Sequence, residues 1–258
     1  MMEELTLKER RNAILNLLHE NGKVKVSELS EKFNVSEVSI RNDLADMEAE
    51  GKLSRVHGGA ISAYDSYYNM SLAQRSNTNR EAKDRIAKKV STIIFDTNSV
   101  MINAGTTAFA VVKKLAETRK NIKVVTNSII TALENTVSSN LHITLLGGEV
   151  NPEYQYVYGT LTLCELQNYY ADVFIVSADG IDADGGLTTY YDQEVDICRK
   201  MIENSKKVIA VLDSTKLGKV TYKRIADCKD IDVLVTNKNA DKRIVKELKS
   251  NGIEVVLA

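Results

Sequence analysis

The hydrophobic pattern of the first 50 residues repeats at helical spacing in three segments, 6–21, 27–33 and 36–50. A hydroxyl side chain that can cap a helix stands at the start of each segment: Thr6, Ser27 and Ser36. Asparagine or glycine, which tolerate the left-handed backbone that closes a helix, stands where each segment ends: Asn21-Gly22, Asn34 and Gly51. The pattern predicts three short helices, with a tight turn at 34–36 between the second and the third.

The third of these helices has an apolar face and a polar face. Its apolar positions are spaced by four and three residues, at Ile40, Leu44 and Met47, and we expect Val35 and Val38 to extend the packing against the second helix. The other face carries short polar or cationic side chains near the N-terminus: Ser36, Glu37, Ser39, Arg41 and Asn42. Such side chains suit a helix that enters the major groove of DNA.

The segments on either side of the second and third helices are typical of short strands. Lys23 to Val26 is extended in character, and residues 52–60 alternate with period two and end in Gly58-Gly59, which predicts a small hairpin, or wing. We expect Lys25, Arg55 and His57 to reach the DNA backbone or the minor groove. A three-helix bundle without a role in DNA binding is the alternative, but the order of elements favours a winged helix-turn-helix domain over residues 1–60.

From residue 79 onward, apolar runs typical of buried strands alternate with segments typical of helices. The runs that predict strands are 99–103, 122–126, 142–146, 172–177, 206–212, 231–236 and 253–257. The segments that predict helices are 79–92, 107–118, 127–136, 160–170, 190–204 and 241–250. This alternation predicts a mostly parallel sheet covered by helices, an α/β domain over residues 79–258. Residues 61–78 are polar and aromatic without a period, so we expect them to be a linker.

Small and polar residues follow the predicted strands. They are Asn103, Gly105, Thr106 and Thr107 after the first strand, Thr126 and Asn127 after the second, Gly147 and Gly148 after the third, Asp179 and Gly180 after the fourth, and Lys216 after the fifth. Hydroxyl groups, a helix N-terminus and a lysine suit a phosphate, while Asp179 and Asn127 suit sugar hydroxyls. A cap, a turn or a surface lysine explains each motif alone. Because ligands bind beyond the carboxyl ends of parallel strands, five such loops together favour a site for a small polar ligand.

Composition and charge exclude several classes of protein. The net charge of −1 argues against a protein that coats nucleic acid without specificity. The first 60 residues carry nine lysine and arginine residues against eleven acidic residues, so DNA binding there depends on where the cations lie. We expect a cytoplasmic protein, because no apolar run approaches the ~20 residues that span a bilayer and no signal segment is evident. The three cysteines are widely spaced and the three histidines are scattered, so we expect no disulfide, no metal site and no cofactor.

Two runs in the first 60 residues carry a family resemblance. They are Val35-Ser-Glu-Val-Ser-Ile-Arg-Asn-Asp-Leu44 and Glu48-Ala-Glu-Gly-Lys-Leu-Ser-Arg-Val-His-Gly-Gly-Ala60. Both runs resemble the signature of the DeoR family of bacterial regulators. The resemblance implies a transcriptional regulator whose partner is double-stranded operator DNA. The family usually has two consecutive arginines before the Asp-Leu pair, and here Arg41 is followed by Asn42, which can contact adenine or a phosphate but carries no charge.

The resemblance continues through the second domain. Four runs resemble landmarks of the DeoR-type effector domain: Asn103-Ala-Gly-Thr-Thr107, Val125-Thr-Asn-Ser128, Leu146-Gly-Gly148 and Asp213-Ser-Thr-Lys216. Arg75 and Lys83 match the segment that enters this domain, and Glu194 matches a later helix. That domain is related to ribose-5-phosphate isomerase and the coenzyme A transferases, and it commonly senses a phosphorylated sugar. This sequence departs from the family at Asn103, where aspartate is usual, and at Thr97, where glycine is usual.

Kinship with isomerases makes an enzyme the main alternative. Glu194 or Asp179 would be the base and Lys216 the electrophile of an aldose–ketose isomerisation. Against this, Asn103 stands where a carboxylate is usual, and the sequence holds no Walker loop and no Ser-His-Asp arrangement. A second alternative is a regulator that its ligand activates, which the sequence does not separate from a repressor.

The sequence thus predicts a repressor of a sugar or polyol catabolic operon that a phosphorylated sugar metabolite relieves. The effector-binding side chains would be those at the strand ends together with Glu194. We expect a homo-oligomer, a dimer or a tetramer, because one winged helix makes too few contacts for operator-level affinity.

Overall fold

The computed structural model of the chain describes residues 6–49, 52–62, 70–96, 98–135 and 139–258. The chain divides into two compact units, Met1–Met70 (unit 1) and Ser71–Ala258 (unit 2). Among the described residues, no helix combines the length and the apolar character needed to cross a membrane.

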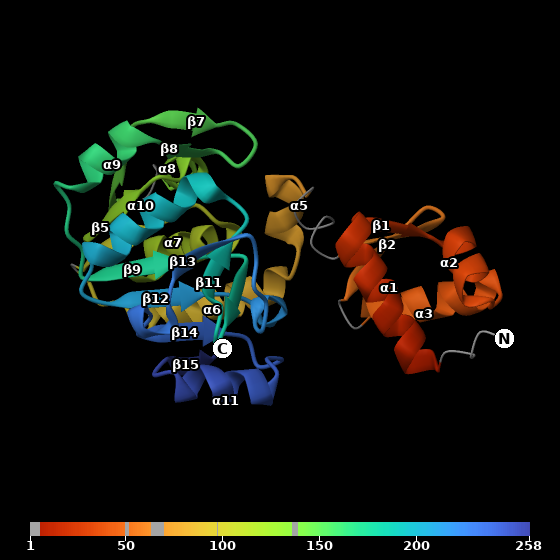
Figure 1. The fold of residues 1–258 in the computed structure, drawn as a ribbon. Coiled ribbons are helices and arrows are strands. Elements are labelled where there is room, and N and C mark those ends of the chain that lie inside the picture. The colour runs from red at the N-terminus through yellow and green to blue at the C-terminus, as the bar shows by residue number, and fades with distance from the viewer. Residues whose placement is uncertain (1–5, 50–51, 63–69, 97, 136–138) are drawn as a thin grey trace. The chain divides into compact units, whose positions relative to one another are not determined.

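The described part of unit 1 contains three helices and a three-stranded antiparallel sheet (Figure 1). Its elements are α1 (Leu7–Asn21), β1 (Lys23–Lys25), α2 (Val26–Phe33), α3 (Glu37–Ala49), β2 (Leu53–Val56) and β3 (Gly59–Ser62). The strand order is β1-β3-β2, so β2 and β3 form the expected hairpin and β1 completes the sheet. The core contains the predicted stripe of α3: Ile40, Leu44 and Met47 are at most 1% exposed.

Local signals explain most of the helix boundaries in unit 1. Thr6 caps α1 and forms a capping box with Glu9, and Gly22 closes the helix in the left-handed conformation. Asn34 makes the turn between α2 and α3 with a φ of 51°. The predicted end of α3 at Glu50-Gly51 lies outside the described residues.

Two sequence-based expectations for unit 1 are wrong. Ser27 does not cap α2, because the helix already begins at Val26 and its N-cap is Lys25, which makes no side-chain capping bond. Val38 does not pack against α2, since 62% of the residue is exposed, whereas Val35 does pack against the core.

Unit 2 is built on a seven-stranded sheet in which every neighbouring pair is parallel. Its strands are β4 (Ser99–Ile102), β5 (Ile122–Thr126), β6 (Leu141–Leu145), β9 (Val173–Val176), β12 (Val208–Val211), β14 (Val233–Thr236) and β15 (Glu254–Leu257). The order is β15-β14-β12-β9-β4-β5-β6. From β4 the chain first adds strands on one side, β5 and β6, and then on the other side, β9, β12, β14 and β15, so the order of addition reverses between β4 and β9. The predicted α/β fold with a mostly parallel sheet is confirmed.

Helices cover both faces of this sheet and make a three-layer structure (Figure 1). The helices of unit 2 are α5 (Leu72–Asn77), α6 (Arg80–Ser91), α7 (Thr106–Thr118), α8 (Ile129–Glu134), α9 (Thr160–Leu166), α10 (Asp192–Glu203) and α11 (Lys242–Ser250). Apolar residues of α6 and α7 form one core cluster with the strands, and those of α9, α10 and α11 form another. Successive strand residues alternate between the two clusters, with Met101 in one and Ile102 in the other.

Short strands that the sequence analysis did not predict stand around the main sheet. β7 (Glu149–Asn151) pairs with β8 (Tyr156–Tyr158), and β10 (Gly180–Asp182), β11 (Gly186–Thr189) and β13 (Lys223–Ala226) form a three-stranded antiparallel sheet. Two 3₁₀ turns, η1 (Ser214–Lys216) and η2 (Cys228–Asp230), follow β12 and β13.

Part of the segment expected as a linker is helical. Helix α5 begins after Ser71, which forms a capping box with Gln74, and its residue Arg75 is buried within unit 2. Residues 63–69 and Thr97 lie outside the described residues. The boundaries 1–60, 61–78 and 79–258 stay a prediction.

Candidate functional site

Helix α3 exposes a polar face near its N-terminus. Ser36 caps the helix, because its Oγ accepts a hydrogen bond of 3.1 Å from the backbone N–H of Ser39. Glu37, Arg41 and Asn42 are exposed. Arg41 forms an ion pair with Glu37 one turn earlier, and both side chains are about half exposed. Exposed pairs contribute little to stability, so Arg41 can exchange Glu37 for a DNA phosphate or base at small cost.

Two arginines of α1 hold α3 in place. Arg10 donates to the Asp43 carboxylate at 2.7 Å, and Arg11 lies 3.4 Å from the same carboxylate and also contacts Asp46. Asp43 is only 3% exposed, so this ion-paired contact fixes α3 against α1. The sequence analysis did not assign Asp43, although its place beside the apolar positions of α3 is a signal of burial. In this structure both arginines are engaged by acidic side chains of α3.

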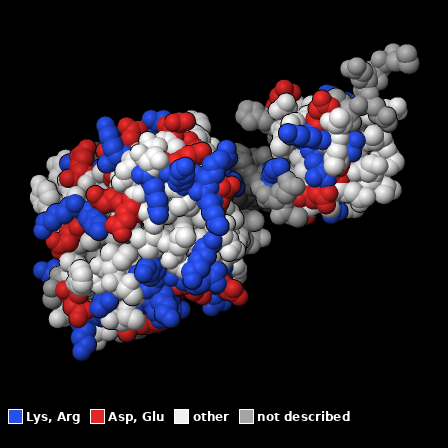
Figure 2. Space-filling model, turned by 90° about the horizontal axis from the view of Figure 1, so that it is seen from below, with Lys and Arg blue, Asp and Glu red and all other residues white. Residues whose placement is uncertain are grey.

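The remaining candidate cations of unit 1 lie on and beside the small sheet. Arg55 on β2 and His57 in the hairpin turn are exposed. Lys25 at the end of β1 is exposed and lies 2.8 Å from Glu28. Figure 2 shows basic and acidic side chains side by side on the visible face of this unit, without a continuous basic surface.

Buried polar side chains follow four central strands of unit 2. Asn103, Asn127, Asp179 and Asp213 stand after β4, β5, β9 and β12, and each is at most 7% exposed. Since buried polar groups need partners, the contacts of these four residues indicate what each one does.

Asn103 joins the loops of β4 and β9, where the strand order reverses. Its Nδ2 donates to the Ser177 carbonyl at 2.9 Å, and its Oδ1 accepts from the Ser177 N–H at 2.8 Å. A carboxylate at position 103 would accept the second bond but could not donate the first, which accounts for asparagine here. A Cβ atom on Gly105 would lie 2.7 Å from the Ser177 side chain, so glycine permits this close approach.

Asn127 connects the β4 loop to helix α10. Its Oδ1 accepts from the Ala104 N–H at 3.0 Å, and its Nδ2 donates to the Val157 carbonyl and lies 3.5 Å from Glu194 Oε1. Burial, assisted by the charge of Asp179, raises the pKa of Glu194 to about 8 against the lowering effect of Asn127. The Glu194 carboxyl is therefore mainly protonated at neutral pH and can both donate and accept hydrogen bonds.

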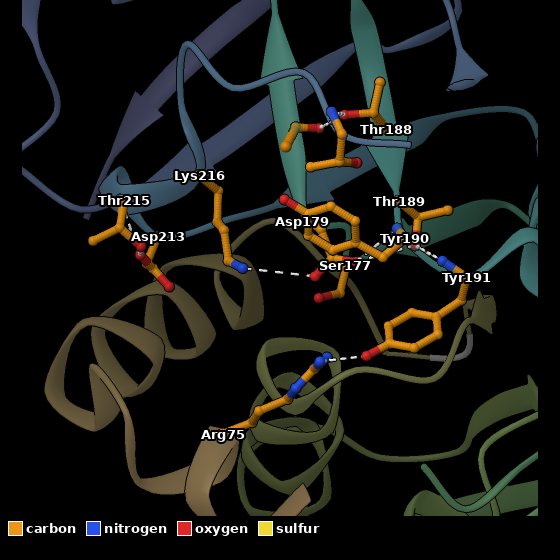
Figure 3. A network of polar contacts seen from close by, with 12 residues as sticks. Arg75, Ser177, Asp179, Thr188, Thr189, Tyr190, Tyr191, Asp213, Thr215 and Lys216 are labelled. Carbon is orange, nitrogen blue, oxygen red and sulfur yellow. Dashed lines mark hydrogen bonds and ion pairs between the residues drawn. The ribbon is translucent and has the colours of Figure 1, made fainter. Parts of the chain in front are cut away.

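Asp179 and Lys216 form a buried ion pair at the end of β9 (Figure 3). Asp179 accepts hydrogen bonds from the Thr189 hydroxyl and the Tyr190 N–H, and its other oxygen lies 3.6 Å from Lys216 Nζ. Burial lowers the pKa of Lys216, while the nearby Asp179 and Asp213 oppose this effect. The predicted residues Asp179 and Lys216 are thus brought together.

Helices α5 and α6 bring two more cations to this network. The Arg75 guanidinium donates to the Tyr191 hydroxyl (Figure 3). It also lies 4.7 Å and 5.2 Å from the ring centres of Tyr154 and Tyr191, a cation–π arrangement. Lys83 Nζ donates to the Arg75 carbonyl. Burial lowers the pKa of Lys83 to about 8. Tyr154 and Tyr191 were missed by the sequence analysis, where aromatic residues in polar loops were the available signal.

A cleft of about 490 Å³ extends along α7 from Thr106 at its N-terminus to Glu117 in its last turn, with residues of α5 and α6 on its other side. Its lining includes Thr106 and Phe109 of α7 and is rich in cations: Arg80, Lys83, Lys88, Lys113 and Lys114, against Asp84 and Glu117. Gly105 precedes α7 and has no side chain, so it does not cap the first-turn N–H groups of the helix. The end of the cleft at Thr106 therefore combines positive charge with the positive end of a helix dipole, an arrangement that favours an anion.

Other predicted site residues have structural contacts of their own. Gly147 N–H donates to Glu165 at 2.7 Å and its carbonyl accepts from Thr162, while a Cβ atom on Gly148 would lie 2.2 Å from the Thr162 hydroxyl. Thr126 Oγ1 accepts from the Ser128 N–H. Thr107 is buried, and Gly180 lies where a Cβ atom would be 2.4 Å from the Lys219 carbonyl. Their part in ligand binding stays a prediction.

Comparison with known families matches both units. The model of the DeoR-like helix-turn-helix domain matches residues 10–65, and that of the DeoR C terminal sensor domain matches residues 78–238. This chain belongs to the DeoR family. As a DeoR protein it is a DNA-binding transcriptional regulator, with α3 as the second helix of its helix-turn-helix and unit 2 as its sensor domain.

Curated relatives align with this DeoR protein over nearly its whole length. The HTH-type transcriptional regulator GolR of Listeria innocua is 32% identical over 97% of this chain and 98% of its own. The transcriptional repressor GlcR of Bacillus subtilis is 30% identical (96% and 95%), and the glycerol-3-phosphate regulon repressor of Escherichia coli is 32% identical (96% and 98%). Among solved structures, a D-ribose-5-phosphate isomerase bound to phospho-erythronic acid covers 53% of each chain at 19% identity and a TM-score of 0.40, too weak a likeness to bear on function.

Proposed function

We propose that this protein represses a sugar or polyol catabolic operon and that a phosphorylated sugar metabolite relieves the repression. The observation that carries the proposal is the convergence of Arg75, Lys83, Lys216 and Asp179 in one buried network at the carboxyl edge of the sheet. The names of similar proteins agree, since one is a glycerol-3-phosphate regulon repressor.

The phosphate and the sugar would occupy different parts of the site. The phosphate would lie at the N-terminus of α7, near the Thr106 hydroxyl and Lys83, which line the cleft, and near first-turn N–H groups that Gly105 does not cap. The sugar hydroxyls would bind Asp179, Asn127 and the protonated Glu194. A ligand without a phosphate would lose the part of the site that has the highest positive charge.

Helix α5 would transmit binding to the DNA-binding unit. It is the first element of unit 2 after the segment that leads from unit 1, and it carries Arg75 into the network. A ligand that engages Arg75 or its tyrosine partners changes the contacts that hold α5. The ligand can shift the equilibrium only by its difference in affinity between the two arrangements.

Two or four copies would bind one operator. A pair of winged helices related by two-fold symmetry reads two half-sites and roughly doubles the contact area of one domain. The dimer or tetramer is part of the proposal, and light scattering of the full-length protein measures the number of copies in the assembly.

A thermal-shift screen of the full-length protein against sugar phosphates, polyol phosphates and free sugars tests the proposal. We expect a phosphorylated compound to raise the melting temperature and to weaken operator binding in a gel-shift assay. Thr106→Val should reduce both responses at least several-fold. Thr160→Val is the matched control, because Thr160 also begins a helix behind a glycine, and it should respond as the wild type does.

Three outcomes would contradict this proposal. One is a screen in which only non-phosphorylated compounds bind. Another is a ligand that strengthens operator binding, which would make the protein a ligand-dependent activator or a co-repressed regulator. The third is isomerisation of a sugar phosphate by the full-length protein, which would make it an enzyme.

A further inference from the structure

Val38 occupies an unexpected position on helix α3. It is 62% exposed although it is an apolar, β-branched residue, which a helix surface does not favour. Single exposed apolar residues are common, so exposure alone says little. In the described part of unit 1, the large apolar residues that are exposed are Leu7, Val38 and Val56, and Val38 is the one of these on α3.

Val38 shares a helix face with the candidate DNA-contacting residues. Positions three and four residues apart lie on the same side of a helix, so Val38, Arg41 and Asn42 form one exposed stripe. The buried stripe of Ile40, Leu44 and Met47 lies on the other side. Val38 is also in the first turn of α3, the part of a recognition helix that contacts base edges.

The major groove offers one strongly apolar feature to such a side chain, the 5-methyl group of thymine. We propose that Val38 recognises a thymine methyl group in each operator half-site. Residues 38 and 42 are about 6 Å apart along the helix axis, and base pairs are about 3.4 Å apart, so this thymine lies within about two base pairs of the position that Arg41 or Asn42 contacts. The inference rests on the DNA-binding role of α3.

Uracil substitution tests this inference, because uracil differs from thymine only by the missing methyl group. The operator is first selected from random duplex DNA with the full-length protein, and each thymine is then replaced singly by deoxyuridine. We expect the wild type to bind about four-fold more weakly at one thymine position per half-site. Val38→Ala removes the contact in both half-sites, so it should bind the thymine operator more weakly by about the square of that factor, and it should show no further loss with uracil at that position.

Leu7→Ala is the control, because Leu7 is an exposed apolar residue of the same unit that lies on α1. It should keep the full sensitivity to uracil. The inference is overturned if no thymine position is sensitive, or if Val38→Ala stays as sensitive as the wild type. If the full-length protein selects no operator at all, the DNA-binding role fails as well, so the two failures are distinguishable.

Discussion

Arg41 is the cation of unit 1 best placed to contact bases. Arg10 and Arg11 hold α1 to α3 through Asp43, and Arg55 lies on the wing. Arg41 is on the exposed face of α3, and its partner Glu37 is a side chain of the same helix. Few positive charges therefore determine whether this near-neutral unit binds DNA.

Arg41→Ala should weaken operator binding by about five-fold to a hundred-fold for each half-site, because a bidentate arginine contact to a base contributes about 1–3 kcal/mol. Fluorescence anisotropy with labelled operator measures the affinity, and thermal unfolding checks the fold. Arg85→Ala is a matched control, since Arg85 also pairs with a glutamate one turn earlier on an exposed helix face. Equal binding by Arg41→Ala and the wild type would refute the role of α3 in recognition.

Glu194→Gln should remove a pH dependence of stability. The folded-state pKa of Glu194 is raised to about 8 from its ordinary value near 4.5, so the native state binds a proton that the unfolded state releases. The stability linked to this proton is fully present below pH ~4.5 and is lost as the pH rises toward 8. The melting temperature of Glu194→Gln should therefore rise relative to the wild type between pH 5 and pH 8. A constant difference across this range would show that the Glu194 carboxyl is ionised in the native protein.

At the level of elements, strong periodic patterns predicted the main architecture. The seven parallel strands and the helices α6, α7, α10 and α11 coincide with apolar runs or helical periods that the sequence shows directly. Strands β7, β8, β10, β11 and β13 have three or four residues, and several of the parallel strands have only four. These five strands do not lie within longer apolar runs, so no pattern marks them. Helix α5 has six residues, and its signal was the Ser71–Gln74 capping box.

Only part of the candidate site was predicted, again because local sequence patterns do not show contacts between distant elements. Residues directly after strands, such as Asn127 and Asp179, were found because parallel strands end at one edge. Their partners come from elements far away in the sequence: Tyr154 from the loop before β8, Tyr191 from the turn before α10, and Arg75 from α5. Nothing in a local pattern brings these three side chains together.

Arg75→Met should weaken the response of operator binding to ligand without weakening operator binding itself. Methionine keeps an apolar contact with Tyr154 and Tyr191 but removes the charge and the hydrogen bond to Tyr191. We expect operator binding without ligand to stay near the wild-type level, while the ligand concentration needed for release rises about ten-fold or more. Arg243→Met, on the exposed face of α11, is the control. A normal response of Arg75→Met would contradict the proposed role of α5.

At the scale of the whole molecule, the low charge leads us to expect that operator binding depends on assembly. The chain has a net charge of −1, and the candidate cations of each winged helix are Lys25, Arg41 and Arg55. A dimer would bring about six positive charges to one operator. In the proposed dimer, affinity would depend on holding two such units at the spacing of the half-sites, and a ligand in unit 2 would alter this spacing.

The salt dependence of operator binding should reflect this small number of charges. For about four phosphate contacts in a dimer, from Lys25 and Arg55 of each copy, the logarithm of the affinity should fall with the logarithm of salt concentration with a slope of about −4. Arg55→Ala should make this slope shallower by about two units, one for each copy. A slope near zero would contradict binding through these cations.

The most direct measurement is the affinity of the full-length protein for its selected operator with and without the sugar phosphate that most raises its melting temperature. We predict that the ligand weakens operator binding by about ten-fold or more, within the usual range of allosteric coupling, and that the non-phosphorylated sugar has no such effect. Operator binding that no sugar phosphate weakens would contradict the proposed function.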